Sequence, residues 1–298
     1  MAFPYPHGAL PIAVAPYDVP TGAAERVLLL SPRDSDLATL VASTAVTTLP
    51  VTNLQSPEPT KKWRSTSTAG QSIDITLASG LGCNAAALVG HNLSGAGLWR
   101  VRGYAALADV GSTAASDTGW QSVWAGGVKP IDASWAHHLA LVRWTSSGDH
   151  RWWRIEFADP APTTTWLEAG RLVLGVAFQP SLNCDFSGAV GWMPDDVQEP
   201  TPYGQTFTDP RPFRKRRFVL PFGSMDQDEA HEGAMQFARL HGLAGDLICC
   251  LDPGELARFH TWSMQGLLVT GSHDFTPRPL FLNGRMMWGF TFTLLEKL

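Results

Sequence analysis

The sequence predicts a mainly β protein, with an antiparallel β-sandwich followed by a smaller α+β unit. Nine of its twelve tryptophans lie between Trp63 and Trp166. Short apolar runs alternate with Gly, Ser and Asp clusters over residues 26–178, where helical periodicity is nearly absent. Because an indole buries a large area and needs a partner for one N–H, this density is typical of a packed sandwich or an aromatic binding face.

The first unit, residues 26–180, is the predicted sandwich. Residues 72–77 alternate polar and apolar side chains with a period of two, which is typical of a half-buried strand. Many short strands separated by turn clusters predict an antiparallel sandwich or jelly roll. The expected strands cover residues 26–30, 45–49, 72–77, 85–89, 98–104, 139–144, 152–157 and 172–178.

Two stretches are expected to lie outside the folded units. Residues 1–25 are rich in proline, which holds a chain extended and cannot donate ladder hydrogen bonds. Their apolar side chains leave two interpretations open: a loosely ordered terminus, or an arm that bridges neighbouring subunits. Residues 181–204 have the composition of a linker. We expect no signal peptide, because no basic segment opens the chain, and no membrane insertion, because no run reaches ~20 apolar residues.

The second unit, residues 205–298, is predicted to combine strands with one main helix. Ser224 is the expected N-cap of that helix, with Gln227 as its capping-box partner and Gly242 as the stop signal. Acidic residues in the first turn and basic residues in the last suit the helix dipole. Strands are expected over residues 217–222, 247–251, 266–270 and 286–295, with a short helix over 255–262.

Composition and motifs argue against several classes of function. A net charge of −5 disfavours broad binding to phosphate backbones and sequence-specific nucleic-acid recognition. The adjacent Cys249 and Cys250 lie in an apolar run and are expected to be buried thiols. His137 and His138 are adjacent, so on a strand they would point to opposite faces and grip no common metal. No phosphate loop, zinc motif or nucleophile elbow is present, so we expect a non-enzyme with no cofactor or metal.

Three tryptophans are candidates for carbohydrate contact. Trp120, Trp124 and Trp135 lie in loop-like surroundings rich in glycine. An exposed indole stacks on the apolar face of a sugar ring, so one interpretation of these residues is a glycan platform. The alternative is packing in the core or at a subunit interface, where large aromatic side chains usually lie.

A basic cluster opens the second unit and is the candidate subunit interface. It consists of Arg214, Lys215, Arg216 and Arg217, and the acidic residues Asp226, Asp228 and Glu229 follow on the predicted helix. In a head-to-tail ring, two different patches of one protein meet, so opposite charges would set the register. The alternatives are a solvated stretch and contact with DNA, which the overall negative charge disfavours.

Two parts of the chain resemble phage tail proteins. The first resembles the discoidin or galactose-binding-like jelly rolls of tailed-bacteriophage tail proteins. Its matching segments are residues 52–55, 63–65, 88–94, 99–103 and 152–157. The second resembles the ring-forming units of phage tail-tube and distal-tail proteins. Its matching segments are residues 217–222, 246–253 and 292–296.

The resemblance implies a structural virion component at the tail tip or baseplate, made in the host cytoplasm. It implies a homo-oligomeric ring whose partners are other tail proteins such as tube, hub or fibre. The alternative function is a carbohydrate-binding adhesion module that contacts polysaccharide on the host surface. Dispersed carboxylates such as Asp149, Glu156 and Glu168 leave a glycan hydrolase as a third alternative.

Overall fold

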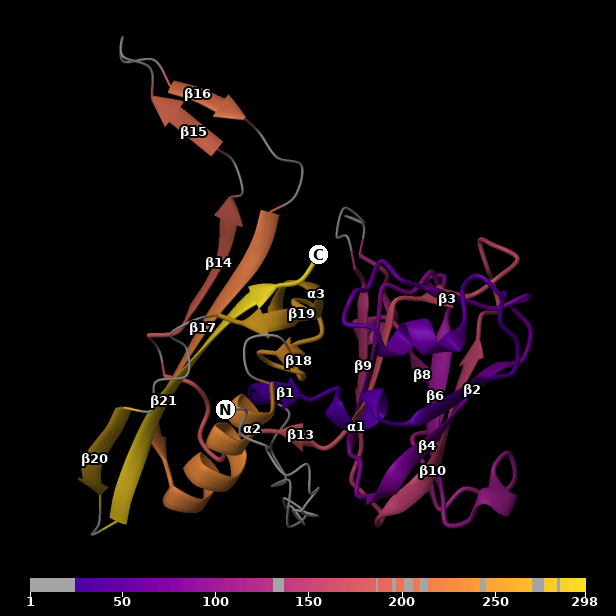
Figure 1. Cartoon of the computed structure of the whole chain (residues 1–298), viewed down its shortest axis with the longest axis horizontal. Coiled ribbons are helices and arrows are strands. Elements are labelled where there is room, and N and C mark those ends of the chain that lie inside the picture. The colour runs from indigo at the N-terminus through magenta and orange to yellow at the C-terminus, as the bar shows by residue number, and fades with distance from the viewer. Residues whose placement is uncertain are drawn as a thin grey trace, which may run out of the picture.

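The computed structural model describes residues 25–130, 137–185, 187–194, 197–200, 206–209, 214–241, 245–269, 276–282 and 285–298. Three layers of antiparallel β-sheet make up most of this part of the chain, as Figure 1 shows. We call them the outer, middle and large sheets. The predicted mainly β fold and its sandwich are confirmed.

The outer sheet contains six of the described strands. Its path is β2-β4-β10-β6-β7, and β8 also pairs with β6. The strands are β2 (Thr39–Ala42), β4 (Gln71–Leu81), β6 (Leu98–Tyr104), β7 (Ser116–Asp117), β8 (Gln121–Ser122) and β10 (His150–Ala158). The expected alternation in β4 is present, because Ile73, Ile75 and Leu77 are buried whereas the residues between them are partly exposed.

The middle sheet has the order β12-β5-β9 and packs against the outer sheet. Its strands are β5 (Ala85–Val89), β9 (Leu139–Arg143) and β12 (Arg171–Gly175), and a smaller pair, β3 (Trp63–Arg64) with β11 (Glu168–Ala169), lies beside it. Trp63, Trp99, Trp124 and Trp153 fill the core between these layers and are almost fully buried. Much of the tryptophan cluster therefore forms the sandwich core.

The middle sheet is buried on both faces, which explains its almost uninterrupted apolar strands. In β5, Ala86 and Leu88 face the sandwich core. Ala85, Ala87 and Val89 face a second core, which they share with the large sheet. The sandwich and the second unit therefore pack through a common apolar layer.

The large sheet has the order β13-β1-β18-β19-β21-β17-β14, and β20 also pairs with β21. Its strands are β1 (Leu28–Leu30), β13 (Ala177–Phe178), β14 (Ala189–Pro194), β17 (Arg214–Met225), β18 (Asp246–Cys250), β19 (Ser263–Leu268), β20 (Thr276–Leu282) and β21 (Arg285–Glu296). Beyond β14 and β17 lies a separate pair, β15 (Val197–Pro200) with β16 (Thr206–Asp209), seen at the top of Figure 1.

The strand pairing corrects two expected boundaries. β1 and β13 belong to the large sheet and not to the sandwich, because Leu28 pairs with Cys250 and Leu29 with Phe178. The expected linker, residues 181–204, contains β14, which forms a six-residue ladder with β17. The expected strand over residues 45–49 is reduced to one isolated bridge between Val46 and Leu49.

The main helix covers the face of the large sheet that lies away from the sandwich. It begins at Gln227 and comprises a π-helical segment, η5 (Glu229–Met235), followed by α2 (Gln236–His241). Its buried face packs on the sheet, and three of its four core residues are alanines, which let the helix approach closely. These residues are Ala230, Ala234, Phe237 and Ala238. Gly233 lies against the Phe178 ring, where a Cβ would clash.

The N-cap of this helix is Asp226 and not Ser224, which corrects the expected helix start. β17 extends through Ser224 to Met225. Asp226 then accepts a hydrogen bond from the Glu229 backbone N–H through Oδ1 at 2.8 Å. An Asp at this position satisfies one of the unpaired N–H groups of the first turn as well as a serine does.

The remaining described helical elements are short. They are α1 (Arg33–Asp36), α3 (Phe259–Trp262), η2 (Val51–Gln55), η3 (Leu107–Asp109) and η4 (Ala125–Gly127). In the part of the chain that the structure describes, no helix has the length and apolar character that crossing a membrane requires. The expected arm, residues 1–25, lies outside the described residues except for Glu25.

Candidate functional site

Trp120 lies on the surface of the sandwich, in the turn between β7 and β8. Both strands pair with β6, so the turn is held along the edge of the outer sheet. Gly119 has a φ of +66°, and its N–H donates to Asp117 Oδ1 at 2.8 Å. Gln121 Nε2 donates to the Thr118 carbonyl at 3.0 Å. These contacts fix the turn and leave 43% of Trp120 exposed.

One face of the Trp120 ring is covered by a cation. The Arg100 guanidinium carbon lies 4.8 Å from the ring centroid, which is a cation–π contact. Arg100 Nε in turn donates to Glu156 Oε2 at 2.7 Å, and its Nη1 lies 3.8 Å from Asp117 Oδ2. The indole is therefore held as a platform by a side chain that is itself anchored.

An ion-pair network continues from Arg100 across the solvent-facing side of the outer sheet. Arg102 lies 3.4 Å from Asp117 and 3.7 Å from Glu156, and Arg154 Nε donates to Asp74 at 2.6 Å. The Asp74 hydrogen bond raises the pKa of Arg154. Since exposed ion pairs contribute only ~0–1 kcal/mol each, the network holds side chains in place more than it stabilises the fold.

Trp124, the second candidate, is a core residue, which corrects its assignment as a sugar contact. It is 1% exposed, and its Nε1 donates to the Ser94 carbonyl at 2.6 Å. The rings of His91 and His138 each lie 4.9 Å from it in edge-on orientation. A ligand cannot reach this indole. Trp135, the third candidate, lies outside the described residues.

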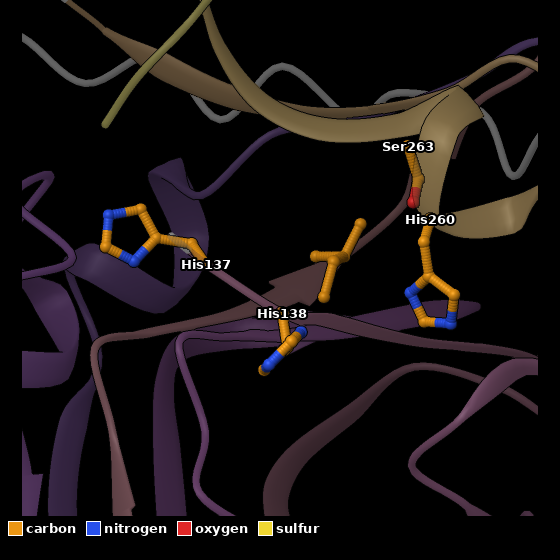
Figure 2. Close-up of a pocket in the computed structure, with 5 residues that line it drawn as sticks. His137, His138, His260 and Ser263 are labelled. Atoms are coloured by element: carbon orange, nitrogen blue, oxygen red, sulfur yellow. The ribbon is translucent and has the colours of Figure 1, made fainter. Parts of the chain in front are cut away.

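A small pocket lies where the sandwich meets the second unit. Figure 2 shows its lining, which consists of His137, His138, Leu139, His260 and Ser263. The two adjacent histidines point in different directions, as their positions in the sequence predict. His138 packs on Trp124, whereas His137 lies beside Gly90.

The histidines around this pocket are kept neutral by burial. Desolvation, followed by electrostatic repulsion from His138, Lys129, Lys62 and His260 when they carry a proton, lowers the pKa of His91 to about 3. Desolvation also lowers the pKa of His138 to about 4 and the pKa values of His137 and His260 below their usual range. Within the described ranges, no three His, Cys, Asp or Glu side chains are arranged to hold a metal ion.

Ser263 does not form a nucleophile–base pair with these histidines. Its hydroxyl donates to the Phe259 carbonyl at 2.6 Å. Two of the three carboxylates considered for a hydrolase have ion-pair partners: Glu156 pairs with Arg100, and Glu168 pairs with Arg64 and Lys62. Glycan hydrolysis needs a protonated carboxylic acid beside a carboxylate. Burial opposes the ionised form of Glu168, but its contacts with Arg64 and Lys62 outweigh burial and lower the pKa of this carboxyl.

The basic cluster divides into one buried and three solvent-facing cations. Arg216 is buried, ion-paired with Glu296 and bonded to the carbonyls of His260 at 2.6 Å and Ser263 at 2.7 Å. Arg216 is therefore an internal anchor, which corrects its assignment to a subunit interface. Arg214 and Arg217 are exposed and Lys215 is partly exposed.

The acidic half of the expected interface divides in the same way. Asp226 and Asp228 are exposed. Glu229 is buried, and its carboxylate accepts hydrogen bonds from the backbone N–H and the hydroxyl of Ser181. Glu229 therefore ties the helix to the segment after β13 and is not available to another subunit.

Sequence reasoning missed the buried charge cluster around Arg171. Its guanidinium is completely buried and pairs with Asp246 and with Asp36. Gln265 Nε2 also donates to Asp246 at 2.6 Å. Arg171 itself could have indicated this cluster, because it is a single arginine at the start of an apolar strand. A lone charge in such a strand needs a buried partner.

The four cysteines are free thiols, and three of them are buried. Cys249 and Cys250 are consecutive residues of β18, and both are buried, as the apolar run predicts. Burial raises the pKa of Cys250 to about 12 and raises the pKa of Cys249 well above its usual range. Neither thiol is reactive at neutral pH.

Comparison with known proteins identifies structures but no family. No protein-family model matches this chain, and no curated protein does. The structure is similar to a family 32 carbohydrate-binding module of NanJ from C. perfringens, solved with galactose. The identity is 11%, the match covers 50% of this chain and 99% of that one, and the TM-score is 0.36.

Two further solved structures are similar over a comparable length. One is a third family 32 module from a family 31 glycoside hydrolase of Clostridium perfringens, at 14% identity, covering 48% of this chain and 93% of that one, with a TM-score of 0.34. The other is the lectin domain of lectinolysin with the Lewis B antigen, at 10% identity, covering 46% and 92%, with a TM-score of 0.33.

Proposed function

We propose that this chain is a non-catalytic protein whose sandwich binds carbohydrate through the surface around Trp120. The observation that supports the proposal is the half-exposed indole, which is held on a rigid turn with Arg100 against its ring. An indole face packs on the C–H face of a pyranose ring, and the polar groups around it select orientation. Trp124 and the other fully buried tryptophans offer no such face.

The charges around Trp120 favour a neutral sugar. Three arginines, at positions 100, 102 and 154, accompany three carboxylates, those of Asp74, Asp117 and Glu156. Their charges cancel, and each arginine has a carboxylate partner. Such a surface offers both donors and acceptors to hydroxyl groups, whereas an anionic sugar would have to displace an existing ion pair.

The experiment is retention of neutral glycans on an array or by titration calorimetry, with wild type and Trp120→Ala. Removing the platform is expected to reduce glycan binding at least tenfold while the thermal unfolding midpoint stays unchanged. Trp192→Ala is the matched control, because Trp192 is exposed to a similar degree but lies on β14, away from the sandwich. Unchanged glycan binding by Trp120→Ala contradicts the proposal.

A second candidate function is structural: a ring component of a bacteriophage tail tip or baseplate, located in the virion. The observation that favours it is the charge pattern of the second unit, with exposed cations on β17 and exposed acids at the helix start. Head-to-tail contact between copies would pair the two patches. Light scattering tests this function: rings or co-assembly with tail-tube proteins support it, and a monomer inert towards those proteins contradicts it.

A further inference from the structure

β14 forms an edge of the large sheet and carries exposed apolar side chains. In the strand order it is terminal, with β17 as its neighbour among the described strands. Val190 is 48% exposed, Trp192 49% and Met193 43%. In Figure 1, β14 and β17 run together from the body of the sheet towards β15 and β16.

Within the described residues, the part of this edge before Pro194 lacks the features that usually keep other chains from pairing with it. An edge strand presents unpaired backbone N–H and C=O groups, and proteins normally guard it with charged residues, bulges or a covering element. Residues 189–193 are Ala, Val, Gly, Trp and Met, with no charge. The pairing with β17 runs without a register shift, so there is no bulge. A Cβ built at Gly191 would meet no atom within 4 Å, so the middle of the strand is open.

Cations line the neighbouring strand. Lys215 lies opposite Met193 and Arg217 opposite Gly191, so both side chains share one face of the sheet with these residues. Within the described residues, Arg214, Lys215 and Arg217 take part in none of the ion pairs, whereas Arg216 pairs with Glu296. Three solvated cations therefore flank an apolar, uncharged edge.

We propose that the β14 edge binds an extended acidic segment of a partner protein as an added strand. A strand paired to β14 would lie about 9–10 Å from β17, twice the usual strand spacing. The long side chain of Arg217 can span that distance to a carboxylate, because Gly191 places no side chain between them. Val190 and Trp192, on the opposite face, would pack on apolar side chains of the added strand.

The same features argue against two other occupants. A nucleic acid suits the cations and the indole but has no backbone that continues a β ladder. A second copy pairing through its own β14 would bring two sets of β17 cations closer together, and like charges oppose this contact. The acidic strand satisfies the ladder, the charge and the apolar face together. The proposal is independent of the sugar site at Trp120.

Fluorescence anisotropy with the full chain tests the proposal. The probe is a labelled eight-residue peptide of alternating Val and Glu, compared with a Val–Lys peptide and a Val–Glu peptide carrying two central prolines. We expect the Val–Glu peptide to bind, and binding to weaken at least tenfold with Arg217→Glu or Lys215→Glu. The proline peptide should not bind, since proline cannot donate ladder hydrogen bonds.

The controls separate this surface from the sugar site. Trp120→Ala is expected to bind the Val–Glu peptide as wild type does, and Arg217→Gln provides a milder variant if charge reversal perturbs folding. Equal binding of acidic and basic peptides, or equal binding of the proline peptide, would overturn the proposal. So would a β14-dependent homodimer in light scattering, or binding of single-stranded DNA with the same dependence on Arg217.

Discussion

Arg171 and Asp246 form a buried, two-point ion pair that joins the sandwich to the large sheet. Arg171 Nε donates to Asp246 Oδ2 at 3.0 Å, and Nη2 donates to Oδ1 at 2.9 Å. Arg171 opens β12 of the middle sheet, and Asp246 opens β18 of the large sheet. Nη1 also donates to Asp36 Oδ1 at 2.5 Å, so one guanidinium connects three elements.

Arg171→Met is expected to destabilise the protein by about 3–5 kcal/mol, because it leaves Asp246 buried without its counter-charge. Urea unfolding at pH 7 measures the change. The double variant Arg171→Met with Asp246→Leu should recover much of the loss, since no buried charge then remains between the two strands. Arg33→Met is the control at an exposed arginine. A loss below 1 kcal/mol for Arg171→Met contradicts the assigned role.

Trp124→Phe is expected to cost more stability than Trp120→Phe, because Trp124 lies in the core and Trp120 lies at the surface. Trp124 donates to the Ser94 carbonyl and contacts His91 and His138, so its truncation removes a buried hydrogen bond and leaves a cavity. We expect a loss of about 2–4 kcal/mol at Trp124 and under 0.5 kcal/mol at Trp120. Thermal unfolding measures both. Equal losses at the two positions would show that Trp120 is not a surface platform.

The difference in burial between these two tryptophans shows what the local sequence can predict. Both lie near glycines, and both were expected in loops. Trp120 stays at the surface because its turn joins β7 to β8, which form the edge of the outer sheet beside β6. Trp124 is buried because His91 and His138, from distant parts of the chain, close around it. The loop setting was predictable, but the burial was not, since it depends on contacts between elements.

Strand positions were predictable from period and composition, whereas strand partners were not. The apolar run at residues 28–30 indicates a strand, but its partner β18 lies near the other end of the chain. β14 was hidden because Gly191 and Pro194 weaken its strand pattern. Arg216 looked like its neighbours in the basic run, and only the pairing with Glu296 shows that it is internal.

Gly170→Ala is expected to destabilise the protein by about 1–3 kcal/mol. A Cβ at Gly170 would lie 2.0 Å from the Pro59 carbonyl oxygen, far closer than van der Waals contact, and both partners are backbone that cannot easily move. Gly191→Ala is the matched control, because a Cβ there meets open space. Urea unfolding of the two variants measures the difference. If Gly170→Ala is as stable as Gly191→Ala, the close approach of these two loops is not as described.

Stability is expected to fall on mild acidification because of the histidines at the junction of the two units. The pKa of His91 in the folded state, about 3, lies below the ordinary value of about 6.5 expected on unfolding. As the pH falls below about 6.5, the unfolded chain binds a proton that the folded chain does not. Each such imidazole then lowers the free energy of unfolding by ~1.4 kcal/mol per pH unit, until the pH reaches the folded-state pKa of that imidazole.

His91→Phe tests this pH dependence, because phenylalanine keeps an aromatic ring against Trp124 and cannot titrate. Within the described residues, neither ring nitrogen of His91 has a hydrogen-bond partner, so the substitution breaks no hydrogen bond there. Unfolding free energies from urea titrations at pH 7, 6, 5 and 4.5 should fall less steeply for the variant, by ~1.4 kcal/mol per pH unit. His138→Phe should flatten the profile in the same way over its narrower range, since its pKa is about 4. Parallel pH profiles for wild type and His91→Phe would show that this imidazole titrates alike in both states.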